Sequence, residues 1–180
     1  MLNFPIKNNY LNHFHQSTGL RDNFFVSLLS NYYNKSINVL ELGTSRDIRN
    51  DARNGDGWST LWWLTHVLCF GGHITAIDMS SESIDNCKKL TNGYENYINY
   101  IIDDGEKYLN NKFDIIYLDG SDDPKDMLRQ FEVCMEFDSM IVMDDFHTKG
   151  SLVYDKYKNK VQIFNCNGSH LIGYFKKSIK

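Results

Sequence analysis

The sequence lacks the features of several common protein classes. Only two of its 180 residues are proline, and its four cysteines are widely spaced and include no C-x-x-C pair. This spacing gives no support to a zinc cage and fits reduced thiols in a core. The longest apolar run, Trp58 to Phe70, is interrupted by polar residues and is shorter than the ~20 residues that a membrane-spanning helix needs. We therefore expect no membrane partner.

Positive charge is also scarce. The chain has 19 Lys+Arg against 23 Asp+Glu, a net charge of −4, and its lysines gather only near the C-terminus. Without a basic stripe, a nucleic acid partner is not expected. The start of the chain, Met1 to Pro5, lacks a basic segment followed by an apolar stretch and a cleavage site. These features predict a cytoplasmic protein.

Glutamate is the rarer acid by a wide margin. Of the acidic residues, 17 are aspartate and 6 are glutamate. Solvent-exposed helix faces favour glutamate, whereas the shorter carboxylate is favoured at turns, helix caps and metal sites. The positions of the aspartates are therefore informative.

Strand and helix patterns alternate along the chain. Strands are predicted at 37–42, 73–78, 97–102, 113–119, 139–144, 161–165 and 171–175, and helices at 22–33, 58–70, 80–90, 106–110 and 124–137. This order predicts an α/β, Rossmann-like fold: a seven-stranded, mostly parallel sheet with helices on both faces and a C-terminal antiparallel hairpin turning at 166–169. We expect one domain over 1–180, with an N-terminal arm and helix at 1–36 and a core at 37–176.

Each of the first five predicted strands finishes in carboxylate. The residues are Glu41, Asp78, Asp103 with Asp104, Asp119, and Asp144 with Asp145. Ligands of open α/β sheets bind outside the carboxyl ends of the strands, so these acids predict a binding site along one edge. The alternative is that aspartate merely serves as a turn and cap residue after a strand.

The loop after the first strand limits the class of ligand that the predicted site can bind. It reads Val39-Leu40-Glu41-Leu42-Gly43-Thr44-Ser45 and lacks the G-x-G-x-x-G pattern of dinucleotide sites. An acid in this loop repels phosphate but suits a cationic ligand. The segment resembles the first motif of the class I S-adenosylmethionine-dependent methyltransferases, and the resemblance extends over roughly 37–175.

The resemblance implies a cofactor site. Glu41, Gly43, Thr44 and Ser45 match the loop near the methionine part of the cofactor, and Asp78, followed by Met79, matches the acid that accepts hydrogen bonds from both ribose hydroxyls. Asp104, with Asp103 as a neighbouring candidate and Gly105 beside them, matches the acid near the adenine. Trp58 and Ser59 lie in a segment similar to the family's Gly-x-Ser-Thr helix start, and Asp119 also faces the predicted site. The departure is an insertion at 46–56, which we expect to fold over cofactor or substrate, although a surface loop is equally consistent.

A metal site is predicted beside the cofactor. Adjacent strands ending in Asp119 and in Asp144-Asp145 bring together hard oxygen ligands that suit Mg²⁺, Mn²⁺ or Ca²⁺. This arrangement is similar to the catechol-type and antibiotic-sugar O-methyltransferases, in which it implies a magnesium ion that lowers the pKa of the acceptor hydroxyl. Alternatively, Asp119 only contacts the cofactor and the aspartate pair caps a loop.

Two residues are candidates for the catalytic base. Asp122 occupies the place where the catechol-type enzymes carry a lysine, but it also precedes the helix predicted at 124 and suits a cap. His147 lies two residues beyond Asp145 and has a side chain that titrates near neutral pH, but it also fits an exposed loop.

Together these features predict a metal-dependent methyltransferase that acts on a hydroxyl of a small molecule or sugar. The alternatives are a metal-free methyltransferase of the same fold and a non-catalytic S-adenosylmethionine-binding protein. Acceptor specificity is expected from the N-terminal arm, the insertion, a loop at 146–160 or a second subunit of a homo-oligomer.

Overall fold

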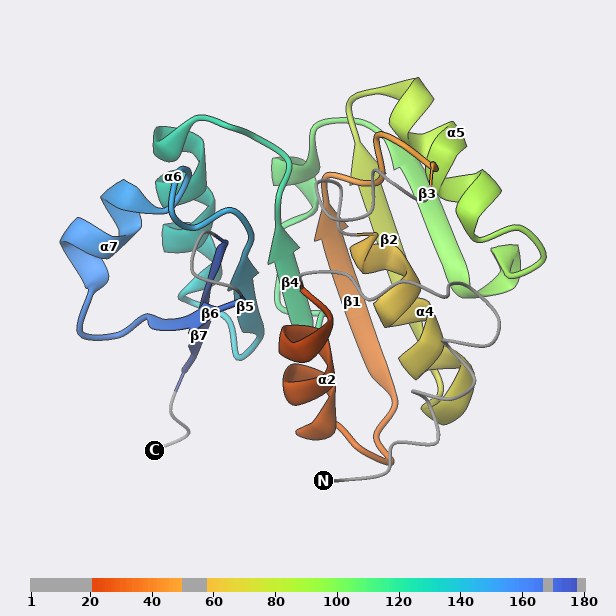
Figure 1. The fold of residues 1–180 in the computed structure, drawn as a ribbon, viewed down its shortest axis with the longest axis horizontal. Helices are drawn as coiled ribbons and strands as arrows, with labels where there is room; N and C mark the ends of the chain where they lie inside the picture. The colour runs from red at the N-terminus through yellow and green to blue at the C-terminus, as the bar shows by residue number, and fades with distance from the viewer. Residues whose placement is uncertain (1–20, 50–57, 167–169, 178–180) are drawn as a thin grey trace.

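A computed structural model describes residues 21–49, 58–166 and 170–177. Its seven strands form one sheet in the order β3-β2-β1-β4-β5-β7-β6 (Figure 1). The strands are β1 (Ile37–Leu42), β2 (Gly72–Asp78), β3 (Ile98–Ile102), β4 (Ile115–Leu118), β5 (Met140–Met143), β6 (Gln162–Asn165) and β7 (Leu171–Lys176). The first five strands are parallel, whereas β7 pairs antiparallel with both β5 and β6. The predicted sheet and its C-terminal hairpin are confirmed.

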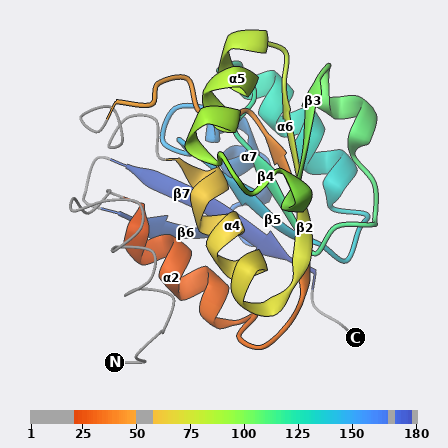
Figure 2. The ribbon, with the colours of Figure 1, turned by 90° about the vertical axis from the view of Figure 1, so that its right-hand side faces the viewer.

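Helices cover both faces of the sheet (Figure 2). The elements are α2 (Asp22–Ser30), α4 (Ser59–Phe70), α5 (Ser81–Leu90), α6 (Pro124–Cys134) and α7 (Ser151–Tyr157), with 3-10 turns η2 (Glu95–Tyr97) and η3 (Gly105–Tyr108). Apolar side chains of α2, α4 and α5 pack in one core cluster, and those of α6 and α7 pack in the other. None of the helices in the described ranges is long and apolar enough to cross a membrane.

The alternation of side chains along β1 explains why helices must cover both faces of the sheet. Val39 belongs to the core on the α4 side, whereas Leu40 and Leu42 belong to the core on the α6 side. Because successive side chains of a strand point to opposite faces, a central parallel strand must be apolar throughout. Glu41 lies two residues after Val39, so its side chain points to the same face of the sheet. It therefore faces α4 and points away from the face on which Leu42 lies.

Local sequence signals set the ends of the helices. The Ser80 hydroxyl accepts a hydrogen bond from the backbone N–H of Ser83 at 3.2 Å, and the Asp123 carboxylate accepts one from Lys125 at 2.9 Å. Ser80 and Asp123 are therefore the N-caps of α5 and α6, and Asp122, which also suits a cap in the sequence, is not the N-cap. Gly71 ends α4 with a φ of 86°, a conformation that glycine adopts without strain.

The structure differs from the sequence expectation in two segments. The helix expected at 106–110 is the four-residue 3-10 turn η3. Residues 146–160, expected as a loop, contain the seven-residue helix α7. Val153 is fully buried, and Tyr157 packs its ring on Phe131 of α6 with 5.4 Å between centroids. A helix this short derives its stability from such packing rather than from its own propensity, so the sequence pattern alone does not reveal it.

Candidate functional site

The carboxyl ends of the central strands form one continuous edge. The backbone N–H of Gly43 donates to Ile77 at 2.8 Å, and that of Asp119 donates to Leu42 at 2.9 Å. These bonds extend the strand pairing just past the strand ends, so the loops after β1, β2 and β4 leave the sheet at the same level. The strand ends that the sequence predicts to share one edge therefore do so.

A cleft runs along this edge in two adjoining lobes of about 290 and 380 Å³. Both lobes are lined by Gly43, Asp78, Gly120 and Ser121. Of the residues predicted to bind a cofactor, those that line the cleft are Gly43, Thr44, Asp78, Met79, Asp103, Asp104, Gly105 and Asp119. Asp122, one of the two predicted bases, lines the second lobe.

Asp78 lies where the two lobes meet. One of its carboxylate oxygens accepts a hydrogen bond from the backbone N–H of Thr44 at 2.9 Å, and the other accepts from Ser80 at 2.8 Å. These bonds fix the carboxylate at the end of β2. The oxygen bonded to the Thr44 N–H also accepts the Thr44 hydroxyl at 3.4 Å, a long contact that a ligand hydroxyl can replace, and the other oxygen keeps a second lone pair for a hydroxyl group in the cleft.

Gly43 allows the loop after β1 to pass close to the loop after β4. A Cβ atom at this position would lie 2.6 Å from the backbone oxygen of Asp119, and Gly43 has a φ of +84°. A side chain at Gly43 would push the two loops apart.

Replacing Gly43 with alanine is expected to destabilise the protein more than replacing Gly93. Gly93 has a similar φ of +89°, but a Cβ atom added there would meet nothing within 4 Å, so Gly93→Ala carries only the backbone strain. The difference in free energy of unfolding should be roughly 1–3 kcal/mol, the usual destabilisation from overpacking. Urea unfolding of both variants measures it, and equal losses would show that the close approach is relieved without strain.

The far end of the cleft is lined by acids after β3. The Asp103 carboxylate accepts from Lys107 and from the Tyr108 hydroxyl, and Asp104 caps η3 by accepting from the Glu106 backbone N–H at 3.0 Å. The pKa of Asp103 is lowered from its usual value, chiefly by the hydrogen bond from Lys107. Both acids are therefore held in place, and Asp104 is the more exposed.

Four predicted cofactor residues do not line the cleft. Glu41 is fully buried, and its carboxylate accepts from the hydroxyls of Ser59 and Thr60 and from Trp63 Nε1 at 3.1 Å. Trp58 is also fully buried. Ser45 and Ser59 are 3% and 8% exposed. Glu41 thus anchors the start of α4 to β1.

Asp144 lies at the centre of a buried polar network. Its carboxylate is 2.8 Å from Arg21 Nε, accepts from the Tyr117 hydroxyl at 2.6 Å, and lies 2.9 Å from His170 Nε2. Burial alone would raise the pKa of Asp144, but the hydrogen bond from His170 and the charge of Arg21 hold it well below its usual range. Asp144 is therefore an ionised carboxylate with both oxygens engaged.

Lys149 lies among the remaining carboxylates. Its Nζ atom is 2.6 Å from Asp119, 3.2 Å from Asp122 and 3.5 Å from Asp145, and its side chain is 5% exposed. Burial would lower the pKa of Lys149, but these carboxylates, Asp119 foremost, raise it. Burial, followed by the charge of Asp144, raises the pKa of Asp119 to about 8.

This arrangement does not fit a magnesium ion held by Asp119, Asp144 and Asp145. Both oxygens of Asp144 already accept hydrogen bonds or pair with cations, and the Lys149 ammonium touches the other two carboxylates. A dication bound by Asp119 and Asp144 would have to displace the Lys149 ammonium and face the Arg21 guanidinium. Lys149 and Arg21 supply the positive charge that the sequence pattern attributes to a metal.

Arg21, Lys149, Tyr117 and His170 are site residues that the sequence pattern does not reveal. Arg21 lies 123 positions from Asp144 in the chain, and no local pattern links them. Lys149 lies four residues after Asp145, a spacing that can indicate an ion pair, but the sequence predicts a loop for this segment. Residues 50–56 of the insertion lie outside the described residues.

Comparison with known proteins identifies the fold. No family model and no curated protein matches the sequence. Among solved structures, an S-adenosylmethionine-dependent O-methyltransferase (TM0748) from Thermotoga maritima is similar with a TM-score of 0.63 at 9% identity, over 99% of this chain and 74% of that one. A methyltransferase from Geobacter sulfurreducens has a TM-score of 0.58 at 10% identity, over 98% and 91%.

A third similar structure, from Clostridium thermocellum, is assigned as an rRNA-methylase and has a TM-score of 0.59 at 13% identity, over 91% of this chain and 98% of that one. All three share the chain's architecture at low identity. In this chain the strand order is 3-2-1-4-5-7-6, with β7 antiparallel between β5 and β6. The chain therefore has the fold of the class I S-adenosylmethionine-dependent methyltransferases.

Proposed function

We propose that the protein is an S-adenosylmethionine-dependent methyltransferase that methylates a hydroxyl group of a small molecule or sugar. The observation that carries the proposal is the cleft at the carboxyl edge, in which Asp78 presents acceptor positions beside the close-packed Gly43 loop. No phosphate-binding glycine pattern accompanies it, so an uncharged diol and a cationic centre suit the cleft better than a dinucleotide.

The residues of the cleft fit the parts of the cofactor in order. Asp78 accepts from the ribose hydroxyls, and Asp104 with Gly105 lies at the end assigned to adenine. Gly43 and Thr44 lie at the end assigned to the methionine part, next to Asp119. The negative charge of the exposed Asp122 carboxylate favours a ligand that carries a sulfonium.

For the acceptor proton, the geometry favours Asp122 over His147. Asp122 lines the second lobe and its side chain is 84% exposed, so it can meet an acceptor hydroxyl there. His147 is exposed on the turn after β5 and is not among the residues that line the two lobes. We propose that Asp122 accepts the proton and that Lys149 holds its carboxylate in place.

The side-chain contacts at the predicted metal site give little support to the metal dependence that the sequence predicts. Lys149 contacts the carboxylates that a magnesium ion would need, so we assign no step to magnesium. The proposal is a transfer in which positioning and deprotonation by the protein supply the rate enhancement.

A nucleic acid acceptor is not favoured. One of the similar structures is an assigned rRNA-methylase, but at 13% identity that likeness extends to the fold alone. This chain has a net charge of −4, and acids line its cleft. A polyanion would be repelled at this edge.

The experiment is a methyl-transfer assay with labelled S-adenosylmethionine and a panel of sugars and phenols, using chelator-treated protein. We expect one acceptor class to be labelled, Mg²⁺ addition to leave the rate within about twofold, and Asp122→Asn to lower the rate by roughly 100-fold or more at unchanged cofactor binding. Strong stimulation by Mg²⁺ would instead support the metal-dependent enzyme that the sequence predicts. Cofactor binding without transfer to any acceptor would favour a non-catalytic binding protein.

A further inference from the structure

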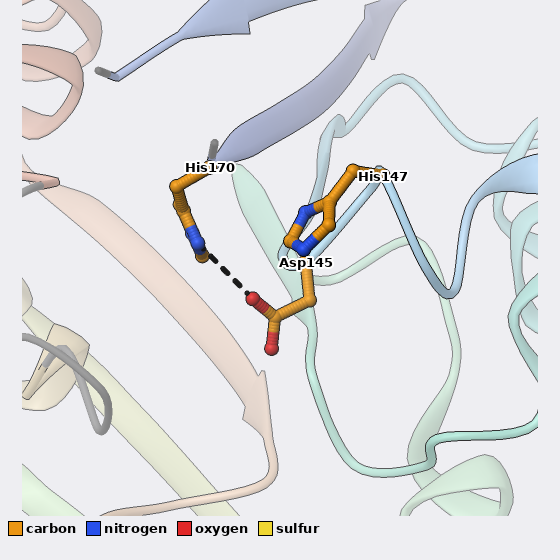
Figure 3. Close-up of side chains that lie close together, drawn as sticks. All are labelled: Asp145, His147 and His170. Atoms are coloured by element: carbon orange, nitrogen blue, oxygen red, sulfur yellow. Dashed lines mark ion pairs between the residues drawn. The ribbon is translucent and has the colours of Figure 1, made fainter. Parts of the chain in front are cut away.

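We propose that Asp145, His147 and His170 form a binding site for a divalent transition-metal ion, separate from the cofactor cleft. The three side chains converge from the turn after β5 and from the residue before β7 (Figure 3). One possible ligand atom from each lies within 4.8 Å of the others. None of the three lines the two lobes of the cleft, so the inference goes beyond the proposed function.

The distance between the two inner ligands suits a shared ion. His170 Nδ1 lies 3.2 Å from an Asp145 carboxylate oxygen. Two ligands that each lie ~2.1 Å from one metal, at angles between octahedral and tetrahedral, are roughly 3.0–3.4 Å apart. The His147 ring is 5.6 Å from that of His170, centroid to centroid, and its exposed position on a turn leaves room for the small shift that coordination requires.

The hydrogen bonding of His170 directs its second ring nitrogen towards the proposed ion. Its Nε2 atom lies 2.9 Å from the ionised Asp144 carboxylate, which can only accept, so Nε2 carries the proton. In a neutral imidazole Nδ1 then has a lone pair, and this lone pair faces the Asp145 oxygen. A metal ion between them would bind this lone pair and the Asp145 oxygen, and the adjoining His147 ring offers a third ligand atom within 4.8 Å.

The pairing of His170 with Asp144 also matches the surroundings of metal sites. Histidine ligands usually donate their other ring N–H to a carboxylate, which fixes the tautomer and orients the ring. Asp144 is itself held by Arg21 and Tyr117, so the ring of His170 has a fixed direction. Its side chain is 10% exposed, that of Asp145 24%, and His147 is exposed, which leaves one side of the site open to water.

The local charge balance accommodates a dication. Four carboxylates, Asp119, Asp122, Asp144 and Asp145, surround two cations, Arg21 and Lys149. With neutral histidines and all four carboxylates ionised, the formal charge of this group is −2, and with Asp119 protonated, as its raised pKa favours, it is −1. Arg21 and Lys149 each contact Asp145 only at 3.4–3.5 Å, so its carboxylate is the least engaged of the inner acids.

The ligand set selects the class of ion. Two imidazoles and one carboxylate suit zinc, iron, cobalt or nickel, whereas magnesium and calcium prefer oxygen ligands throughout. Three protein ligands leave open positions for water or a substrate atom. The site therefore takes a borderline transition metal and discriminates against magnesium.

Calorimetric titration of untagged, chelator-treated protein with Zn²⁺ tests this site, with no cofactor present. We expect one Zn²⁺ per chain, no comparable heat with Mg²⁺, and binding at least about tenfold weaker in His147→Ala. His73→Gln is the matched control, because it removes a histidine at the start of β2 without touching the three ligands, and it should bind Zn²⁺ like the unaltered protein. Titration with Co²⁺, followed by the visible absorption of the bound ion, should give the same order of affinity for the unaltered protein and the two variants.

Three results would overturn the site. They are no Zn²⁺ binding, equal weakening in His147→Ala and His73→Gln, and a doubly protonated His170 in nitrogen NMR spectra that Zn²⁺ leaves unchanged. His147 is exposed, so its replacement is not expected to affect folding, and circular dichroism checks this. Because S-adenosylhomocysteine binding is measured separately, loss of the metal site and failure of the proposed function are distinguishable.

Discussion

Asp78→Asn is expected to weaken S-adenosylhomocysteine binding by roughly 100-fold. The ribose hydroxyls need a group that accepts on both sides, and the two carboxylate oxygens of Asp78 also hold the backbone N–H groups of Thr44 and Ser80. An amide replaces one acceptor by a donor and removes the charge. The loss of hydrogen bonding to a charged group weakens binding by about 3 kcal/mol, which corresponds to roughly 100-fold in affinity. Isothermal titration of the variant measures the change.

The matched control for this variant is Asp85→Asn. Asp85 undergoes the same chemical change on α5, where its side chain is 62% exposed and pairs with Lys88. It lies outside the two lobes of the cleft, so binding should stay within about twofold of the unaltered protein. If Asp78→Asn also stays within that range, Asp78 does not hold the ribose and the orientation proposed for the cofactor is wrong.

The largest effect on stability is expected for Asp144→Asn. The carboxylate is 1% exposed and pairs with Arg21, whose side chain is 4% exposed. Neutralising Asp144 removes the nearest counter-charge of the buried guanidinium and leaves the longer contact with Asp145 at 3.4 Å. Breaking a buried ion pair in this way typically destabilises by about 3–5 kcal/mol. Urea unfolding measures the loss, and Asp155→Asn on the exposed side of α7 is the control that should change little.

The loss should depend on pH in a defined direction. The folded-state pKa of Asp144 lies below its usual value, so its ionised form contributes stability above the usual carboxyl range, ~4, and this contribution falls as the pH falls. The difference between Asp144→Asn and the unaltered protein should therefore be largest near neutral pH and smaller at acidic pH. A difference that grows on acidification would contradict the paired, ionised state of Asp144.

Local patterns are enough to predict the sheet and the edge on which the acids lie. The apolar runs of β4 and β5 and the capped starts of α5 and α6 are signals within a few residues of each other. Because the strands are parallel, the residues that follow them must meet at one edge. Strand ends differ from the prediction by one or two residues, as for β4, which begins at Ile115 rather than Phe113.

The partners of the acids could not be predicted in the same way. Arg21 reaches Asp144 from the residue before α2, and His170 reaches it from the start of β7, so both contacts depend on how distant elements pack. Strand parity, however, does predict the direction of Glu41, because Val39 and Glu41 point to the same face of β1. The alternation of side chains along β1 therefore indicates that Glu41 faces α4. The sequence motif does not reveal that three groups on α4 donate hydrogen bonds to it.

The most direct test of the central claim is titration of the unaltered protein with S-adenosylhomocysteine, with NAD⁺ as the comparison ligand. The account predicts saturable binding of one S-adenosylhomocysteine per chain and no comparable binding of NAD⁺, because the Gly43 loop lacks a phosphate-binding pattern. Binding of NAD⁺ alone, or no binding of S-adenosylhomocysteine to folded protein at millimolar concentration, would contradict it.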